Sequence, residues 1–405
     1  MKEKLSLPIG WELKTIGDVC VSASSNISQN KLADNEGDYP IFGASGLIKK
    51  VSFYHRDKPY LSIVKDGSGV GRVTKMDAFT SVIGTLQYIL PKENIDLDYL
   101  NYSLMSVDFK KYVAGAAIPH IYFKDYKNEP FLWMPLPEQQ RIVSILDEAF
   151  AAIAKAKANA EQNLKNAKEL FESYLQGVFE NGNWETKKLN EITEVKDGTH
   201  DSPKYIKKGI PFVTQKNIKP DGLTFDDTKF ITETDHEKFY KRSNVTFGDI
   251  LISMIGANRG MAAIVDDKRV FSIKNVGLIK SSENINMNYL LYYLRSSLAI
   301  KYVLFMSNGG AQEFVGLTAL RSFPIPYPSL KEQQTIVRQL DALRAETQKL
   351  EAIYQKKILL LEELKKSILQ KAFAGELLSP KGARYTNDGH NPSDNKKTIT
   401  SPEGA

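Results

Sequence analysis

Two glycine-rich loops carry side chains that are suited to contact a polyanion. The first, at residues 65–72, reads Lys-Asp-Gly-Ser-Gly-Val-Gly-Arg, and the second, at residues 256–260, reads Gly-Ala-Asn-Arg-Gly. Each loop follows a short apolar run, at residues 60–64 and 249–253, that is typical of a buried strand. Glycine lets a backbone approach nucleic acid closely, and arginine presents a fork of donors that fits guanine or phosphate. A plain hairpin with a solvated arginine explains either loop equally well.

We predict that these loops, together with nearby polar segments, contact DNA. Bases are read at their edges, where asparagine and glutamine suit adenine, while lysine suits phosphate. The candidates are Lys65, Ser68, Arg72, His120 and Lys124 in the first half, and Lys196, Thr199, His200, Lys204, Gln215, Lys216, Asn217, Asn258, Arg259 and Gln312 in the second half. For a single histidine such as His120, a structural or solvated role is the commoner one.

Several kinds of chemistry find no support in the sequence. The loop at residues 65–72 lacks the third glycine at dinucleotide-binding spacing, and the chain has no Gly-x-x-x-x-Gly-Lys-Ser/Thr phosphate loop. The segment Asn-Glu-Pro-Phe at residues 128–131 is similar to the Asn-Pro-Pro-Phe motif of amino-methyltransferases, but Glu129 replaces a proline and no glycine-rich cofactor loop precedes it. We interpret this segment as a turn, and we expect a chain without catalytic activity.

The composition fits a globular protein with a mild positive charge. The 54 lysines and arginines exceed the 48 aspartates and glutamates, which gives a net charge of +6. This excess is compatible with a nucleic-acid partner, although many basic proteins have none. The single cysteine, Cys20, excludes a disulfide framework. The sequence begins without an apolar leader and has no stretch long enough to span a bilayer, so we expect a cytoplasmic protein without membrane contact.

The elements that must position the loops occur twice. The matched segments, first copy against second, are 11–16 and 184–189, 93–100 and 283–290, 111–113 and 301–303, and 138–143 and 332–337. Four matches in the same order indicate a tandem duplication with a period of almost 200 residues, so each copy is a domain with an additional element. Between its first and last matched segments the second copy has about twenty more residues, most of them near 199–244.

Each copy combines a mixed domain with a long helix. The apolar runs before the glycine loops predict strands, and residues 99–106 and 289–297 have leucine and tyrosine at helical spacing. We therefore predict compact α+β domains at about 10–135 and 183–328. Prolines at residues 135 and 137, and again at 324–328, mark where a long helix begins after each domain.

The two long helices are expected to pair with each other. A heptad repeat of core positions runs from Ile142 to Tyr174, and a matching repeat runs from Ile336 to Ile368. The first is rich in alanine and the second in larger side chains, which suits close packing. Forty helical residues extend about 60 Å, which is too long for one small domain. Antiparallel pairing within the chain is the main interpretation, and a coiled coil between two chains is the alternative.

The repeated segments resemble those of the specificity subunits of type I restriction-modification systems. The resemblance extends from Trp11 to about residue 378. It is carried by Leu-Pro-Ile-Gly-Trp at 7–11, Pro-Leu-Pro-Glu-Gln-Gln-Arg-Ile-Val at 135–143 with its repeat at 328–337, Asp-Gly-Thr-His-Asp-Ser-Pro at 197–203, and Ser-Ile-Leu-Gln-Lys-Ala-Phe-Ala-Gly-Glu-Leu at 367–377.

The resemblance implies an α+β protein in which two target-recognition domains are joined by two long antiparallel helices. The implied segments are a first domain at 1–135, a helix at 136–180, a second domain at 181–328, a helix at 329–378 and a disordered tail at 379–405. Each domain would read one half of a bipartite, asymmetric DNA target, and the helices would set the gap. This chain would hold no cofactor and no metal. Two methyltransferase subunits would bind S-adenosylmethionine, and two motor-nuclease subunits would use ATP and magnesium.

Apolar side chains on the long helices, outside the heptad positions, predict where the methyltransferase subunits pack. These side chains are Phe150, Phe171, Leu175, Phe179, Ile353 and Ile358. A stand-alone DNA-binding regulator would leave them without a partner, and a scaffold protein held by a coiled coil would leave the glycine loops unexplained. The recognition subunit of another multi-subunit methyltransferase system is a close alternative.

Overall fold

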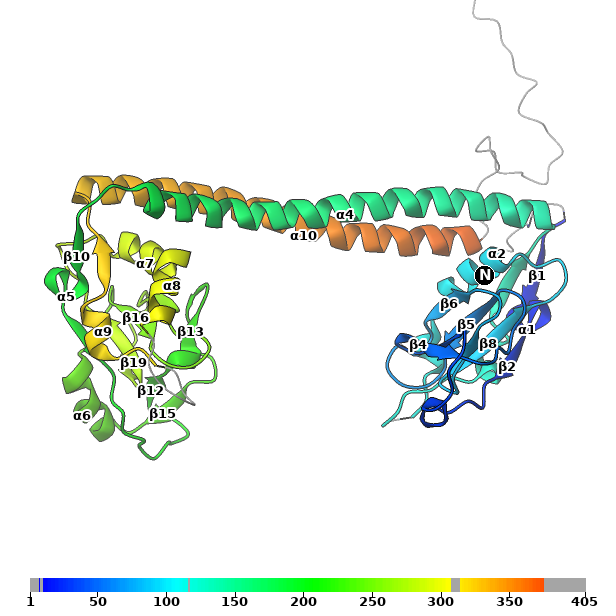
Figure 1. The fold of residues 1–405 in the computed structure, drawn as a ribbon, viewed down its shortest axis with the longest axis horizontal. Helices are drawn as coiled ribbons and strands as arrows, with labels where there is room; N and C mark the ends of the chain where they lie inside the picture. Colours follow the sequence, from blue (N-terminus) through cyan, green and yellow to red (C-terminus); the bar gives the residue numbers. More distant parts are fainter. Residues whose placement is uncertain (1–6, 8–9, 116, 307–313, 375–405) are drawn as a thin grey trace, which may run out of the picture. The chain divides into compact units, whose positions relative to one another are not determined.

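The computed structural model describes residues 7, 10–115, 117–306 and 314–374, and the chain divides into two compact units. Unit 1 comprises Met1–Asn159 and Lys357–Ala405, and unit 2 comprises Ala160–Lys356. Each unit combines a β-rich domain with parts of two long helices (Figure 1). This architecture confirms the predicted α+β class with two domains and two long helices. The predicted tail at 379–405 lies outside the described residues.

The domain of unit 1 is built on two sheets, and the buried strand β5 of the larger sheet contributes side chains to two cores. The four-stranded antiparallel sheet has the order β2-β8-β5-β6, and the three-stranded sheet has the order β4-β3-β7, in which β3 and β7 are parallel. Alternate side chains of β5 enter two different cores: Leu61 packs with helix α2, while Tyr60 packs with Ile41 of β3. Burial on both faces explains why β5 reads as a continuous apolar run.

The elements of this domain are β1 (Glu12–Thr15), α1 (Ile16–Val19), β2 (Cys20–Ser24), β3 (Tyr39–Gly43), β4 (Gly46–Val51), β5 (Tyr60–Val64), β6 (Val73–Met76), β7 (Ser81–Val82), β8 (Leu86–Pro91), α2 (Leu97–Ser106), α3 (Phe123–Tyr126) and β9 (Pro130–Trp133). Strands β1 and β9 pair with each other and bring the two ends of the domain together.

The domain of unit 2 repeats this topology. Its sheets have the orders β11-β19-β16-β17 and β15-β12-β18, with β12 and β18 parallel, and β10 pairs with β20. The central strand is β16, whose Ile250 and Ile252 pack with helix α7 while Leu251 enters the other core. The strand-by-strand correspondence confirms the tandem repeat.

The elements of the second domain are β10 (Thr186–Lys188), α5 (Leu189–Ile192), β11 (Val195–Asp197), β12 (Ile210–Val213), the 3-10 helix η3 (Gln215–Asn217), β13 (Ile218–Lys219), β14 (Gly222–Leu223), β15 (Lys229–Ile231), α6 (Glu233–Ser243), β16 (Ile250–Ser253), β17 (Ala262–Ile264), β18 (Ser272–Ile273), β19 (Val276–Ile279), α7 (Met287–Arg295), α8 (Ser297–Phe305), α9 (Leu317–Arg321) and β20 (Pro324–Pro326). The β13–β14 hairpin and α6 lie in the segment where the second copy is longer.

The long helices are α4 (Leu136–Asn181) and α10 (Leu330–Phe373). In unit 1, Lys365 Nζ lies 5.0 Å from the Phe150 ring centroid, and Lys157 pairs with Glu362 at 2.7 Å. In unit 2, the Arg344 guanidinium lies 4.8 Å from the Phe171 ring centroid. Residue numbers rise along one helix as they fall along the other, so the helices pack antiparallel, as predicted.

The repeated Glu-Gln-Gln segment attaches each helix to its domain. Gln139 is fully buried; its Oε1 accepts from Asp96 N (2.9 Å), and its Nε2 donates to Asn94 O (3.0 Å) and Met134 O (2.7 Å). In unit 2 the equally buried Gln333 accepts from Asn286 N (2.8 Å) and donates to Pro328 O (2.9 Å). Buried backbone groups require such partners. The motif is therefore structural.

Four of the six side chains predicted to contact partner subunits do not form a free surface, which corrects that prediction. Phe150 is buried in the core of unit 1, and the buried core of unit 2 takes in Phe171, Leu175 and Phe179. In each unit both helices pack against the domain as well as against each other, so a second apolar face of each helix is covered within the unit. Ile353 is exposed and Ile358 is half-buried.

Within the ranges that the structure describes, no helix is long and apolar enough to cross a membrane, and no group of His, Cys, Asp or Glu side chains is placed to hold a metal ion.

Candidate nucleic-acid interface

In unit 1 the first glycine loop forms the connection between the antiparallel strands β5 and β6. Gly71 N donates to Val64 O (2.9 Å), and Val64 N donates to Arg72 O (3.0 Å). Gly71 has a φ of +87°, and a Cβ atom there would lie 2.5 Å from Cβ of Phe109, so only glycine fits. The connection is thereby held against the domain, while Ser68 and Arg72 are exposed.

Residues 117–124 pack against this loop. Gly67 N donates to Pro119 O (2.8 Å), and Ile121 N donates to Lys65 O (2.9 Å). His120 forms a backbone bridge with Asp66. The structure therefore brings the five candidates of the first half to one end of the domain: Lys65, Ser68, Arg72, His120 and Lys124.

Two of these side chains are engaged within the loop cluster. The Lys65 ammonium lies 3.5 Å from the Asp66 carboxylate, and both groups are partly solvent-accessible. The Arg72 guanidinium donates to the carbonyl of Ala44 in the turn between β3 and β4. The cluster thus combines three loops, and exposed pairs of this kind exchange easily for a phosphate or a base edge because they contribute little stability.

In unit 2 the second glycine loop forms the equivalent connection between β16 and β17. Gly260 N donates to Ser253 O (2.8 Å), and Arg259 Nη1 donates to Gly256 O (3.0 Å). As in unit 1, a later segment pairs with the loop, since Val315 N donates to Met254 O (2.8 Å). The Ser253 hydroxyl donates to Gln215 Oε1 (3.2 Å), which places Gln215 beside Gly256. Asn258 and Lys216 are exposed, and Gln312 lies outside the described residues.

A second polar cluster in unit 2 surrounds the loop after β11. His200 is exposed, and its ring nitrogens lie 2.7 Å from Asn275 Oδ1 and 3.2 Å from Asp197 Oδ2. Arg242 of α6 donates to both oxygens of Asp197 (2.9 and 2.7 Å). This bidentate contact fixes the base of the loop and leaves the His200 ring at the surface.

Three cations near this loop were missed by sequence reasoning. Arg242 and Lys238 lie on α6, and the Lys274 ammonium donates to Ser202 Oγ (2.5 Å). The hydrogen bond and charge of Lys238 lower the pKa of the Asp201 carboxyl from its ordinary value. Because α6 has no counterpart in the first copy, the repeat offered no signal for the first two residues.

Two predicted contact residues are structural, which corrects the expectation from sequence. Thr199 is buried, and its hydroxyl accepts from Asp201 N (3.1 Å). Asn217 is buried, and its amide bonds to Thr214 N (3.0 Å) and Thr228 Oγ1 (3.1 Å). Both side chains stabilise turns from inside. Of the remaining candidates, Lys196 pairs with Glu194 (3.2 Å), and Lys204 is exposed.

The fold and the loops together define a tandem-repeat protein in which two equivalent domains hold two different loop clusters. Comparison with known proteins agrees with this class. The family model described as the type I restriction modification DNA specificity domain matches residues 8–165 and 181–360. The chain belongs to this family and is a DNA specificity subunit of the type I restriction-modification kind.

Similar proteins cover between 65% and 93% of the chain. The MjaVIII specificity subunit of Methanocaldococcus jannaschii is 24% identical over 408 residues, which covers 92% of this chain and 94% of that protein. The EcoBI specificity subunit of Escherichia coli is 26% identical over 293 residues, or 65% of this chain and 62% of that protein. The HsdS subunit of Thermoanaerobacter tengcongensis superposes with a TM-score of 0.59 at 18% identity, covering 93% of this chain and 99% of that chain.

A second solved structure, from work on complex assembly and conformational transition of the type I system, has a TM-score of 0.70 at 18% identity. The superposition covers 92% of this chain and 100% of the other chain. At this identity the two structural matches establish the fold.

Proposed function

We propose that this chain selects a bipartite, asymmetric DNA sequence, with one half read by each domain. The first recognition domain comprises residues 1–135 and the second comprises 181–328; the helices at 136–180 and 329–378 set the gap between the half-sites. The observation that carries the proposal is that one topology occurs twice and holds two different loop clusters. Two domains of the same topology can contact one DNA duplex at two places, and their different loops can read two different half-sites.

The contact residues we propose are the candidates of the two clusters that are exposed or half-buried. They are Lys65, Ser68, Arg72, His120 and Lys124 in the first domain, and Lys196, His200, Lys204, Gln215, Lys216, Asn258 and Arg259 in the second, to which Gln312 is added from the sequence. Arginine and the amide side chains have the donor patterns for base edges, and the lysines suit phosphates. We assign the methylation and cleavage reactions to partner subunits.

These partners are two methyltransferase subunits that use S-adenosylmethionine and two motor-nuclease subunits that use ATP and magnesium. The assembled complex would methylate adenine at N6 and cut DNA in an ATP-dependent manner in the cytoplasm. Phe150, Phe171, Leu175 and Phe179 are buried, so our candidate docking surface for the methyltransferase is an exposed apolar strip of α10. In α10 the side chains of Ile353, Leu360 and Leu364 lie within about 40° of one another around the helix axis and form this strip, whereas Ile358 and Leu359 point to other sides of the helix. Ile353 is 58% and Leu360 is 51% exposed.

The test is co-expression of the full chain with its methyltransferase subunit, followed by mapping of N6-methyladenine across the host genome. A new motif made of two short blocks around a fixed gap is the expected result. Exchanging loop residues 256–260 should alter one block and leave the other block and the gap unchanged. A stable complex that adds no methylation, or a loop exchange that alters both blocks, would contradict the proposal.

A further inference from the structure

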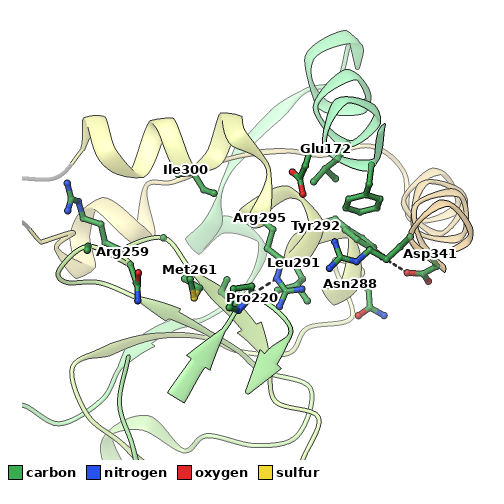
Figure 2. Close-up of a pocket in the computed structure, with 17 residues that line it drawn as sticks. Glu172, Pro220, Arg259, Met261, Asn288, Leu291, Tyr292, Arg295, Ile300 and Asp341 are labelled. Atoms are coloured by element: carbon green, nitrogen blue, oxygen red, sulfur yellow. Dashed lines mark hydrogen bonds between the residues drawn. The ribbon is translucent and has the colours of Figure 1, made fainter. Parts of the chain in front are cut away.

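Unit 2 contains a cavity of about 450 Å³ between the proposed base-reading loop and the long helices. One wall is formed by residues 257–262 of the β16–β17 connection, and the opposite walls come from α4, α7 and α10. Figure 2 shows Arg259 at one end of the lining and Asp341 at the other, with Met261, Arg295 and Tyr292 between them. An occupant would therefore touch both the loop and the helices.

The walls combine apolar side chains with three arginines, Arg259, Arg295 and Arg344, and two carboxylates, Glu172 and Asp341. Phe171, Leu291, Met261 and Ile300 contribute apolar surface. Arg295 Nε donates to Ala262 O (3.0 Å), and Arg344 stacks on the Phe171 ring. Among the residues that the structure describes, no carboxylate forms an ion pair with Arg295 or Arg344. Asp341, which also lines the cavity, instead accepts from the Tyr292 hydroxyl (2.6 Å).

Arg295 and Arg344 line the same cavity, and their like charges repel each other. Burial lowers the pKa of Arg295 and the positive charge of Arg344 lowers it further, while Tyr292 and Asp221 act in the opposite direction without cancelling the shift. Part-buried like charges are unfavourable unless an anion joins them. The apolar walls disfavour a hydrated phosphodiester, whereas a pocket of this size and lining suits a carboxylate on an apolar peptide segment.

From this complementarity we propose that the cavity receives an acidic segment of a partner protein, with its carboxylate between Arg295 and Arg344. In the proposed function, on which this inference rests, that partner is a methyltransferase subunit. The first copy lacks both arginines, because Met105 and Phe150 occupy the equivalent positions. Of two identical partner subunits, only the one bound at unit 2 would use this site.

The test uses the full chain and its methyltransferase subunit, with stoichiometry followed by native mass spectrometry and binding by calorimetry. Arg344→Met removes one charge at similar volume. Asn288→Asp adds a negative charge to the cavity lining from an exposed position in the first turn of α7, where an acidic residue favours the helix. The first copy already has Asp98 at this position. Arg338→Met is the control, because Arg338 is exposed on the same helix and does not line the cavity.

Both variants should weaken one of the two binding steps by tenfold or more, so that complexes with a single methyltransferase subunit accumulate, while the control keeps two. Wild-type affinity in either folded variant overturns the inference. It is also overturned if Arg344→Met instead lowers the salt dependence of binding to random duplex by about 0.9 in the log–log slope, which would identify a DNA phosphate in the cavity. If the wild-type chain binds no methyltransferase, the proposed function itself fails.

Discussion

Replacing Gln139 with alanine should loosen the attachment of helix α4 to the first domain. The side chain is fully buried and makes three hydrogen bonds, all to backbone groups. Its removal leaves Asp96 N–H and the carbonyls of Asn94 and Met134 without these partners. A buried polar group without a partner costs about 1–3 kcal/mol, but carbonyls retain a second lone pair and water can enter the space. We therefore expect a loss of about 2–4 kcal/mol.

The measurement is differential scanning calorimetry of the full chain, with urea unfolding as a second estimate. For a unit of about 200 residues, each kcal/mol lowers Tm by roughly 2–4 °C, so a decrease of roughly 4–16 °C is expected for the transition of unit 1. Gln140→Ala is the matched control, because Gln140 is the next residue and is exposed. Its effect should stay within about 0.5 kcal/mol.

The repeat supplies an independent second measurement. Gln333→Ala should lower the transition of unit 2 in the same way, with the exposed Gln334 as its control. Equal stability of Gln139→Ala and Gln140→Ala would refute the structural role that we assign to the Glu-Gln-Gln segment.

Three further outcomes are expected. Arg259→Met should relax base preference at one position of one half-site by about 1–3 kcal/mol, as measured by methylation mapping; equal weakening on all sequences would assign Arg259 to a phosphate instead. Insertion of four residues into each long helix should add about 6 Å and widen the gap by about two base pairs, and an unchanged gap would show that the helices do not set it. Burial raises the pKa of the Cys20 thiol to about 12, so at pH 8 only about one molecule in ten thousand is thiolate; Cys20 should react with Ellman's reagent only after unfolding, and a fast reaction of the native chain would contradict its buried position.

The internal repeat allowed the fold to be predicted well, because the matched segments occur in the same order in both copies. Matching the two copies was sufficient to expect the same domain twice and two helices that pair. The individual contacts between the two helices were harder to predict from the sequence. A strict heptad places Leu170 and Tyr174 in the contact, yet both are exposed, while Phe171 and Leu175 are buried. A straight helix drifts by about 20° per heptad, so contacts at 3.6-residue spacing leave the predicted positions after a few turns.

The candidate site was predictable only in part, because residue type does not reveal whether a polar side chain faces outward or inward. Thr199 and Asn217 have side chains suited to DNA, but each hydrogen-bonds to nearby backbone and closes a turn. Conversely, no pattern in the sequence around Arg242 indicates its contact with Asp197, because the two residues are brought together only by the tertiary structure. Local capping and long-range ion pairing require the fold to be known before they can be assigned.

The pairing of a cation with a phenylalanine at each end of the helix pair has a consequence for how such chains can recombine. The repeat makes position 150 equivalent to 344, and position 171 equivalent to 365. Phe150 meets Lys365 and Phe171 meets Arg344, so each copy supplies what the other lacks. Two second copies paired together would set Arg344 against Lys365, like charge against like charge. A gene half exchanged between relatives must therefore bring a helix that complements the resident one, whatever DNA its domain reads.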